Sequence, residues 1–329
     1  MTVEMHSMYR FGHSMGLGWA PPGERLDFIA LEIDGNGVSA LGDSNQGDDP
    51  VMSYVTEVIK AKWEPGLEKM TYKEYVQTVK VPGDKRNEDI KGQQKALIGN
   101  FLQFLQESEH PQYQKAKKLY EDTVTKYVNP QTGKIEFKIL PSVIALTERI
   151  KKACHHCITL RTIGKDREKI ETAYNKVGIQ FPRKAQMHPT EGMRFEIGPD
   201  VFSEAITGEK LLEARKEGEY ILGQDNFKVW NENGERAGWS KMIPCSADAQ
   251  FKGLKIVSIF ADDNFRKGNV ENPNEKNIGF PKDVYDRPTS WESRGVIGIH
   301  VNPLKAALNE QYLIRKVNKE LQKRCFRPI

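Results

Sequence analysis

Short apolar runs alternate along the chain with longer stretches of helical periodicity. Four runs, at residues 26–33, 157–160, 254–260 and 296–301, are rich in branched or aromatic side chains and end abruptly, which predicts buried strands. Apolar residues at three- and four-residue spacing predict helices near residues 51–59, 97–105, 113–127, 143–150, 166–177 and 313–321. This alternation predicts an α/β fold.

Two segments depart from that alternation. Residues 51–135 carry helical periodicity without a convincing strand and predict a mostly helical insertion, which leaves residues 1–50 and 136–329 as the α/β core. Residues 227–230 and Trp239 flank the turn-forming run 231–234 and predict a β-hairpin. Residues 1–24, rich in Gly, Met and Pro, predict an irregular leader.

Polar residues follow three of the predicted strands directly. The first strand ends in Asp34 and Asn36, the second in Thr162, and the third in Asp262 and Asp263. In open parallel sheets, ligands bind beyond the carboxyl ends of the strands. These strand ends therefore predict a common site.

Four short motifs follow one another along the chain: Asp34-Gly35-Asn36-Gly37-Val38, Arg161-Thr162-Ile163-Gly164, Lys241 within residues 238–242, and Phe260-Ala261-Asp262-Asp263-Asn264. In this order they resemble the motifs of the haloacid dehalogenase-like superfamily, in particular a subgroup with Asp-x-Asn-Gly-Thr and Arg-Thr-Phe-Gly motifs. The similarity spans roughly residues 26–318. It implies a Rossmann-like three-layer sandwich with a parallel central sheet, in which residues 51–135 form a helical cap over the site.

The resemblance also implies a Mg²⁺-dependent phosphohydrolase with a role for each motif. Asp34 would attack a phosphomonoester and form an aspartyl-phosphate, because a carboxylate needs a cation to approach a phosphate. Mg²⁺ would be held by Asp34, Asn36, Asp262 and Asp263. Thr162 and Lys241 would stabilise the transferring group, and Gly35, Gly37 and Arg161 would contact phosphate.

Alternatives stay open at several of these positions. Asn36 stands where many phosphatases of the superfamily have an acid/base aspartate. Two other functions are therefore open: a catalytically weak protein that binds a phosphorylated ligand or protein, and a phosphotransferase. Lys228 is an alternative to Lys241, and Glu32 would be the first acid in another register. Arg161 is as well suited to a structural salt bridge as to phosphate.

Composition narrows the setting of this chemistry. A net charge of +4 over 329 residues does not indicate nucleic acid as a partner. The four cysteines, including Cys154 and Cys157 beside His155 and His156, are too few for a disulfide scaffold and lack a second pair of zinc ligands. With no apolar run near the ~20 residues of a membrane span, we expect a cytoplasmic protein. The basic residues between 315 and 327 predict a solvated helix face or peripheral membrane contact.

Overall fold

The computed structural model describes residues 23–35, 38–41, 50–83, 87–133, 136–162, 166–188, 192–197, 201–202, 218–234, 236–265, 279–283 and 287–329. All structural statements below refer to these residues. The expected leader before residue 23, the motif residues Asn36 and Gly37, and the pair Ile163-Gly164 lie outside them.

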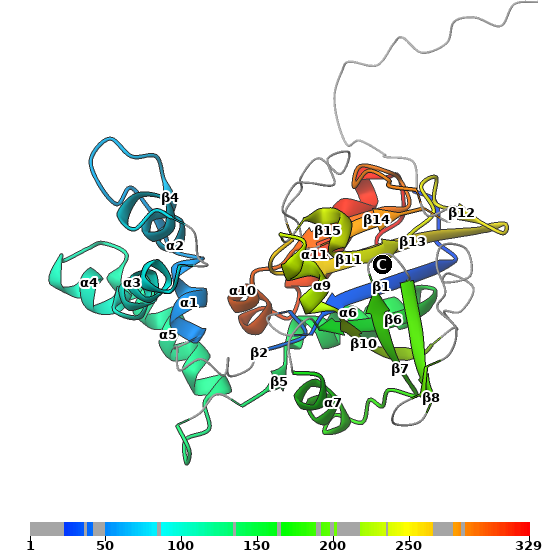
Figure 1. Ribbon diagram of the computed structural model, residues 1–329, viewed down its shortest axis with the longest axis horizontal. Coiled ribbons are helices and arrows are strands. Elements are labelled where there is room, and N and C mark those ends of the chain that lie inside the picture. The colour runs from blue at the N-terminus through cyan, green and yellow to red at the C-terminus, as the bar shows by residue number, and fades with distance from the viewer. Residues whose placement is uncertain are drawn as a thin grey trace, which may run out of the picture.

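A largely parallel sheet forms the middle of the α/β body, on the right in Figure 1. Its strands are β1 (Phe28–Asp34), β6 (His155–Thr162), β7 (Arg183–His188), β8 (Gly192–Ile197), β9 (Val201–Phe202), β10 (Tyr220–Asp225), β12 (Gln250–Phe251), β13 (Leu254–Asp262) and β15 (Val296–His300). Strands β15, β13, β1, β6, β10 and β7 are parallel neighbours in that order. The predicted α/β architecture with a parallel central sheet is therefore confirmed.

The two faces of this sheet are covered differently. Ile29, Leu31 and Ile33 of β1 pack in the largest hydrophobic cluster with helices on one face. These helices are α6 (Pro141–Ala153), α7 (Arg167–Asn175), α10 (Pro303–Leu308) and α11 (Tyr312–Lys323). Because side chains alternate along a strand, Glu32 and Asp34 point to the opposite face. That face carries β11 (Lys241–Pro244), which pairs with β14 (Gly279–Lys282).

The predicted insertion is helical and has a hydrophobic cluster of its own. It contains α1 (Pro50–Thr56), β3 (Lys60–Ala61), β4 (Met70–Thr71), α2 (Tyr72–Tyr75), the π-helix η1 (Val76–Lys80), α3 (Glu88–Gly99), α4 (Phe101–Glu107) and α5 (Tyr113–Tyr127). The chain leaves and re-enters the body through the paired strands β2 (Ala40–Leu41) and β5 (Lys138–Ile139). Leu304 of α10 joins the insertion's cluster, so α10 links the two parts, while their boundaries as domains stay a prediction (Figure 1).

The expected hairpin at residues 227–239 is wrong. Residues Phe227–Glu232 form helix α9, followed by the 3-10 turn η2 (Ala237–Trp239). The side chain of Asn226 accepts a hydrogen bond from the backbone N–H of Val229 at 3.1 Å. This cap satisfies a donor that the first turn of a helix leaves free, and it favours the helix over the strand that the aromatic residues suggested.

The C-terminal helix α11 is strongly amphipathic. Leu313, Val317 and Leu321 are buried, whereas Arg315 and Lys319 are exposed. Lys316 donates to the carbonyl of His300 at 2.6 Å and Arg324, just after the helix, is buried, so the basic stretch is only in part a solvated face. Two of the basic side chains near its end are paired with Glu320, namely Lys323 at 2.6 Å and Arg324 at 3.0 Å. Contact of this surface with a membrane stays a prediction. No helix in the described part of the chain is long and apolar enough to cross a membrane.

Gly298 is expected to be sensitive to substitution because the ring of Phe265 packs directly on the backbone of β15. A Cβ at position 298 would lie 2.1 Å from Cζ of Phe265. We expect Gly298→Ala to lower the free energy of unfolding by about 1–3 kcal/mol, the usual range for overpacking. Urea denaturation measures this change. The matched control is Gly92→Ala in α3, where nothing lies within 4 Å; an equal loss there would contradict the steric explanation.

Candidate active site

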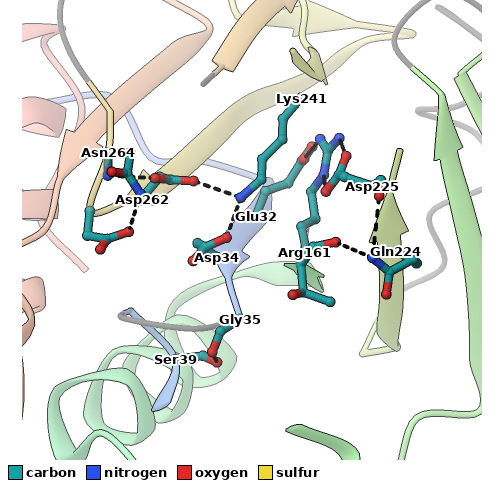
Figure 2. A network of polar contacts seen from close by, with 12 residues as sticks. Glu32, Asp34, Gly35, Ser39, Arg161, Gln224, Asp225, Lys241, Asp262 and Asn264 are labelled. Carbon is teal, nitrogen blue, oxygen red and sulfur yellow. Dashed lines mark hydrogen bonds and ion pairs between the residues drawn. The ribbon is translucent and has the colours of Figure 1, made fainter. Parts of the chain in front are cut away.

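The carboxyl ends of adjacent strands bring the predicted residues together. Strand β1 lies between β13 and β6, with Ile33 opposite Ala261 and Asp34 opposite Arg161. Asp34 and Asp262, which end β1 and β13, therefore lie at the same edge of the sheet, and Thr162 ends the strand on the other side. Figure 2 shows Asp34 and Asp262 facing one another across the side chain of Lys241.

Lys241 connects the two acids. Its ammonium nitrogen donates hydrogen bonds to Oδ1 of Asp34 and, at 2.7 Å, to Oδ2 of Asp262. Lys241 begins β11, and only 1% of its side chain is exposed. The alternative lysine, Lys228, lies on α9 with 82% of its side chain exposed and 3.8 Å from Glu232. The geometry therefore favours Lys241 as the lysine of this site.

One buried cation between two buried carboxylates leaves the cluster with excess negative charge. Burial raises the pKa of Asp34 to about 7, although the ammonium of Lys241 opposes the rise. Burial alone would lower the pKa of Lys241, but the carboxylates of Asp262 and Asp34 outweigh it and raise the pKa. Lys241 is therefore held in its charged form, and protonation of Asp34 is one way in which the excess negative charge is relieved.

Asp263 lies at the edge of this cluster. It is half-buried, and Nδ2 of Asn264 donates to its Oδ1 at 3.0 Å. Burial, followed by the nearby charges of Asp262 and Asp34, raises the pKa of Asp263 well above its usual range. The backbone N–H of Asn264 donates to Oδ1 of Asp262 at 2.7 Å and fixes that carboxylate. The acidic pair predicted from the sequence thus adjoins Asp34, with Asp262 in direct contact with Lys241.

The turn after β1 is held by close backbone contacts around Gly35. The N–H of Gly35 donates to the carbonyl of Arg161 at 2.5 Å, and Oγ of Ser39 donates to the carbonyl of Gly35 at 2.5 Å. A Cβ at position 35 would lie 2.3 Å from Cδ1 of Ile170 and 3.2 Å from Cβ of Thr162. Glycine is needed here for that close approach, and Thr162 lies beside the turn. Ser39, which also donates its N–H to the carbonyl of Asp34 at 3.0 Å, was missed in the sequence.

Arg161 does not face the space beyond the strand ends. Its guanidinium is buried between Glu32 and Asp225, donating to Glu32 at 2.6 Å and through Nε to Asp225 at 3.1 Å (Figure 2). It also donates to the carbonyl of Met242 at 2.6 Å. The structural salt bridge is therefore the alternative that the geometry supports, in place of the expected phosphate contact. Glu32 is fully buried in this pair, which disfavours the register that made it the first acid. Asp225, at the end of β10, gave no motif in the sequence.

The carboxylates of this cluster meet some of the requirements of a binding site for a hard divalent cation. No three acidic, histidine or cysteine side chains converge as a ready-made metal cage in the described residues. Mg²⁺ usually binds through one or two carboxylates, with water and substrate oxygens completing its shell. Asp34 and Asp262, with the adjacent Asp263, supply carboxylates of that kind. Burial of these acids around the single ammonium of Lys241 raises the pKa of Asp34 and of Asp263, and a bound divalent cation would relieve this cost of ionisation.

The helical insertion contacts the α/β body through Tyr54 of helix α1. Tyr54 packs against the hydrophobic clusters of both the insertion and the α/β body. Burial raises the pKa of Tyr54, and the negative charges of Asp263, Glu57 and Asp34 raise it further. The insertion therefore contributes a partly buried aromatic side chain that also packs against the α/β body.

The comparisons with known proteins add little to this geometry. No protein-family model and no curated protein matches the sequence. Among solved structures, the chain is similar to a haloacid dehalogenase-like family hydrolase from Xanthomonas campestris, with 7% identity and a TM-score of 0.27 over 92% of this chain and 99% of that one. The function proposed next therefore rests on the residues of this chain.

Proposed function

We propose that this protein is a Mg²⁺-dependent phosphomonoester hydrolase that uses Asp34 as its nucleophile. The observation that carries the proposal is the buried ammonium of Lys241, shared between Asp34 and Asp262 at the carboxyl ends of two adjacent parallel strands. The order of the four sequence motifs supports it. A cation beside a strand-end carboxylate is the arrangement that lets an aspartate approach a phosphoryl group.

Each chain residue has a distinct task in this reaction. A carboxylate oxygen of Asp34 attacks phosphorus, the bond to the leaving oxygen breaks, and an aspartyl-phosphate forms that water then hydrolyses. Lys241 is already within hydrogen-bond distance of Asp34 and neutralises the charge that the phosphoryl oxygens bring there. The hydroxyl of Thr162 donates to the same oxygens.

Magnesium would be held by Asp34 and Asp262, with Asp263 beside them and the carbonyl of Asn36 as a further proposed ligand. When bound, it polarises the phosphate and offsets the repulsion between two anions. We expect the wild-type protein to release phosphate from p-nitrophenyl phosphate with Mg²⁺. An excess of EDTA should reduce the rate at least ~100-fold, because several kcal/mol of charge stabilisation are lost. Restoring Mg²⁺ should restore the rate, and undiminished release in EDTA would contradict the metal's role.

The insertion is proposed to act as a cap. Tyr54 of the insertion packs against the α/β body, and Leu304 of α10 joins the hydrophobic cluster of the insertion. A cap excludes water from the reacting centre and restricts which phosphoesters enter. We therefore propose that the insertion selects which phosphorylated substrates reach Asp34.

Binding without turnover is the second candidate function, and the amide at position 36 favours it. An amide does not shuttle a proton at neutral pH, and general acid–base help is typically worth 10²–10⁴-fold. Tight phosphate binding by the wild-type protein, with no release from a broad panel of phosphoesters, would favour this function. Transfer of phosphate to added alcohols would instead identify a phosphotransferase.

A further inference from the structure

Strand β11, which carries Lys241, contacts the main sheet through side-chain hydrogen bonds rather than through backbone pairing. In the described residues, β11 pairs with β14 in a separate two-stranded sheet. Two side chains of the main sheet donate to its backbone: Nη1 of Arg161 to the carbonyl of Met242, and Oγ of Ser258 to the carbonyl of Pro244, both at 2.6 Å. The position of Lys241 relative to Asp34 therefore depends on such contacts.

Arg161 is the more constrained of the two donors. Its Nε and Nη2 form a two-pronged contact with the carboxylate of Asp225, and Nη1 donates to Glu32 at 2.6 Å. Glu32, Arg161 and Asp225 lie on the adjacent strands β1, β6 and β10, and all three are buried. A planar guanidinium gripped at both ends has little freedom to rotate. It therefore presents Nη1 to the backbone of β11 in one orientation.

We propose that Arg161 is a positioning residue for Lys241. The guanidinium is fixed by Glu32 and Asp225, and it binds the carbonyl of the residue directly after Lys241. This contact sets the height of β11 above β1 and so places the ammonium of Lys241 between Asp34 and Asp262. The catalytic consequence rests on the proposed function, whereas the placement itself does not.

The chemistry of the guanidinium explains why a lysine cannot substitute here. Arginine serves two carboxylates and a carbonyl at once because its five N–H groups form a rigid fork. A lysine at position 161 would keep the positive charge between Glu32 and Asp225 but has a single nitrogen on a flexible stem. Buried ion networks often stabilise a fold no more than apolar packing does. A positioning role gives this network a purpose besides stability.

Acetylation of Lys241 tests the placement without any enzyme assay. The full-length protein is treated with a water-soluble acetylating ester, and modified lysines are quantified by peptide mass spectrometry. In the wild type, Lys241 should be protected because it is buried and paired with two acids. In Arg161→Lys, we expect its acetylation rate to rise at least about tenfold, as expected when coupled neighbours are separated, while the rate at exposed Lys228 stays unchanged.

Arg183→Lys is the matched control. Arg183 begins β7, the strand that pairs with β10, and forms a half-buried ion pair with Glu219 at 3.0 Å. This variant should leave Lys241 protected. Protection of Lys241 in a folded Arg161→Lys protein would overturn the proposal. If Arg161→Lys does not fold by circular dichroism, Asp225→Asn loosens the same guanidinium while keeping an acceptor. Intermediate acetylation of Lys241 would then support the proposal, and unchanged protection would overturn it.

Kinetics link the placement to the proposed reaction. Arg161→Lys should lower kcat about 10- to 100-fold with KM within about twofold, because the displaced ammonium acts on the transferring group rather than on binding. In a Lys241→Met background, Arg161→Lys should lower kcat no further. A full additional loss there would overturn the proposal. If no variant or wild type hydrolyses any phosphoester, the proposed function fails, and the acetylation result still decides the placement.

Discussion

Replacing Asp34 with asparagine is expected to reduce release of phosphate from p-nitrophenyl phosphate by roughly 10⁴-fold or more, the range seen when a nucleophile is removed. The substitution is nearly isosteric, and the amide oxygen still accepts a hydrogen bond from Lys241. An amide, however, does not form an acyl phosphate. The loss should therefore appear in kcat, measured with Mg²⁺ at saturating substrate.

The same variant should not be destabilised at neutral pH. Burial raises the pKa of Asp34 to about 7 in the folded protein, against 3.8 as its ordinary value. The folded state then binds more protons than the unfolded state between these values, so ionisation of Asp34 lowers stability as pH rises through this window. Without metal, Asp34→Asn should therefore gain stability relative to the wild type between about pH 4 and pH 7, as urea denaturation at several pH values will show.

Asp248→Asn is the matched control for this experiment. Asp248 is an exposed turn residue that accepts hydrogen bonds from Ser246 at 2.8 Å and from the N–H of Gln250 at 3.0 Å. The substitution removes a carboxylate that is paired with Ser246 and Gln250 rather than with Lys241, and the variant should keep wild-type turnover. Equal phosphate release by the wild type and Asp34→Asn would remove Asp34 as the nucleophile.

Lys241→Met is expected to have the second large effect, on both stability and turnover. Methionine fills much of the same volume but leaves the buried carboxylates of Asp34 and Asp262 without their shared cation. Removing one partner of a buried ion pair typically costs about 3–5 kcal/mol. Loss of a preorganised charge-stabilising group should lower kcat by about 10²–10³-fold. Urea denaturation and steady-state kinetics measure the two effects separately.

The stability loss in Lys241→Met should depend on pH in a defined direction. Lys241 is held charged by its two acids, so its loss exposes their mutual repulsion when both are ionised. As pH falls and Asp34 becomes protonated, that repulsion weakens and the variant should approach the wild type. Lys228→Met, which removes an exposed lysine, is the control and should change neither property measurably. A larger kinetic loss in Lys228→Met than in Lys241→Met would reverse the assignment of the site lysine.

The spacing of apolar and polar residues in the sequence predicted several of the strands and helices. Strands β1, β6, β13 and β15 are buried on both faces, so their sequences read as continuous apolar runs. Helix α5 matches its predicted residues because its apolar side chains recur at helical spacing. The hairpin expected at residues 227–239 failed because the cap at Asn226 outweighed the strand preference of aromatic residues.

The residues that hold the site residues in place could not be predicted from the sequence. Asp225 is the last residue of β10 and belongs to no motif, yet its carboxylate pairs with Arg161. Ser39 reads as a turn residue, yet it holds the backbone around Gly35. Both act through contacts with residues distant in sequence or through backbone geometry, which no local periodicity encodes.

The sequence by itself predicted that acids and a threonine end three apolar strands, because strand ends and turn residues are local features. Only the tertiary structure decided which lysine joins them, since Lys241 lies 207 residues from Asp34 and reaches it through a strand outside the main sheet. It also decided that the guanidinium of Arg161 pairs with Glu32 and Asp225. The physical reason is that buried charges must be paired where the folded chain places their partners, and those partners are set by packing rather than by spacing.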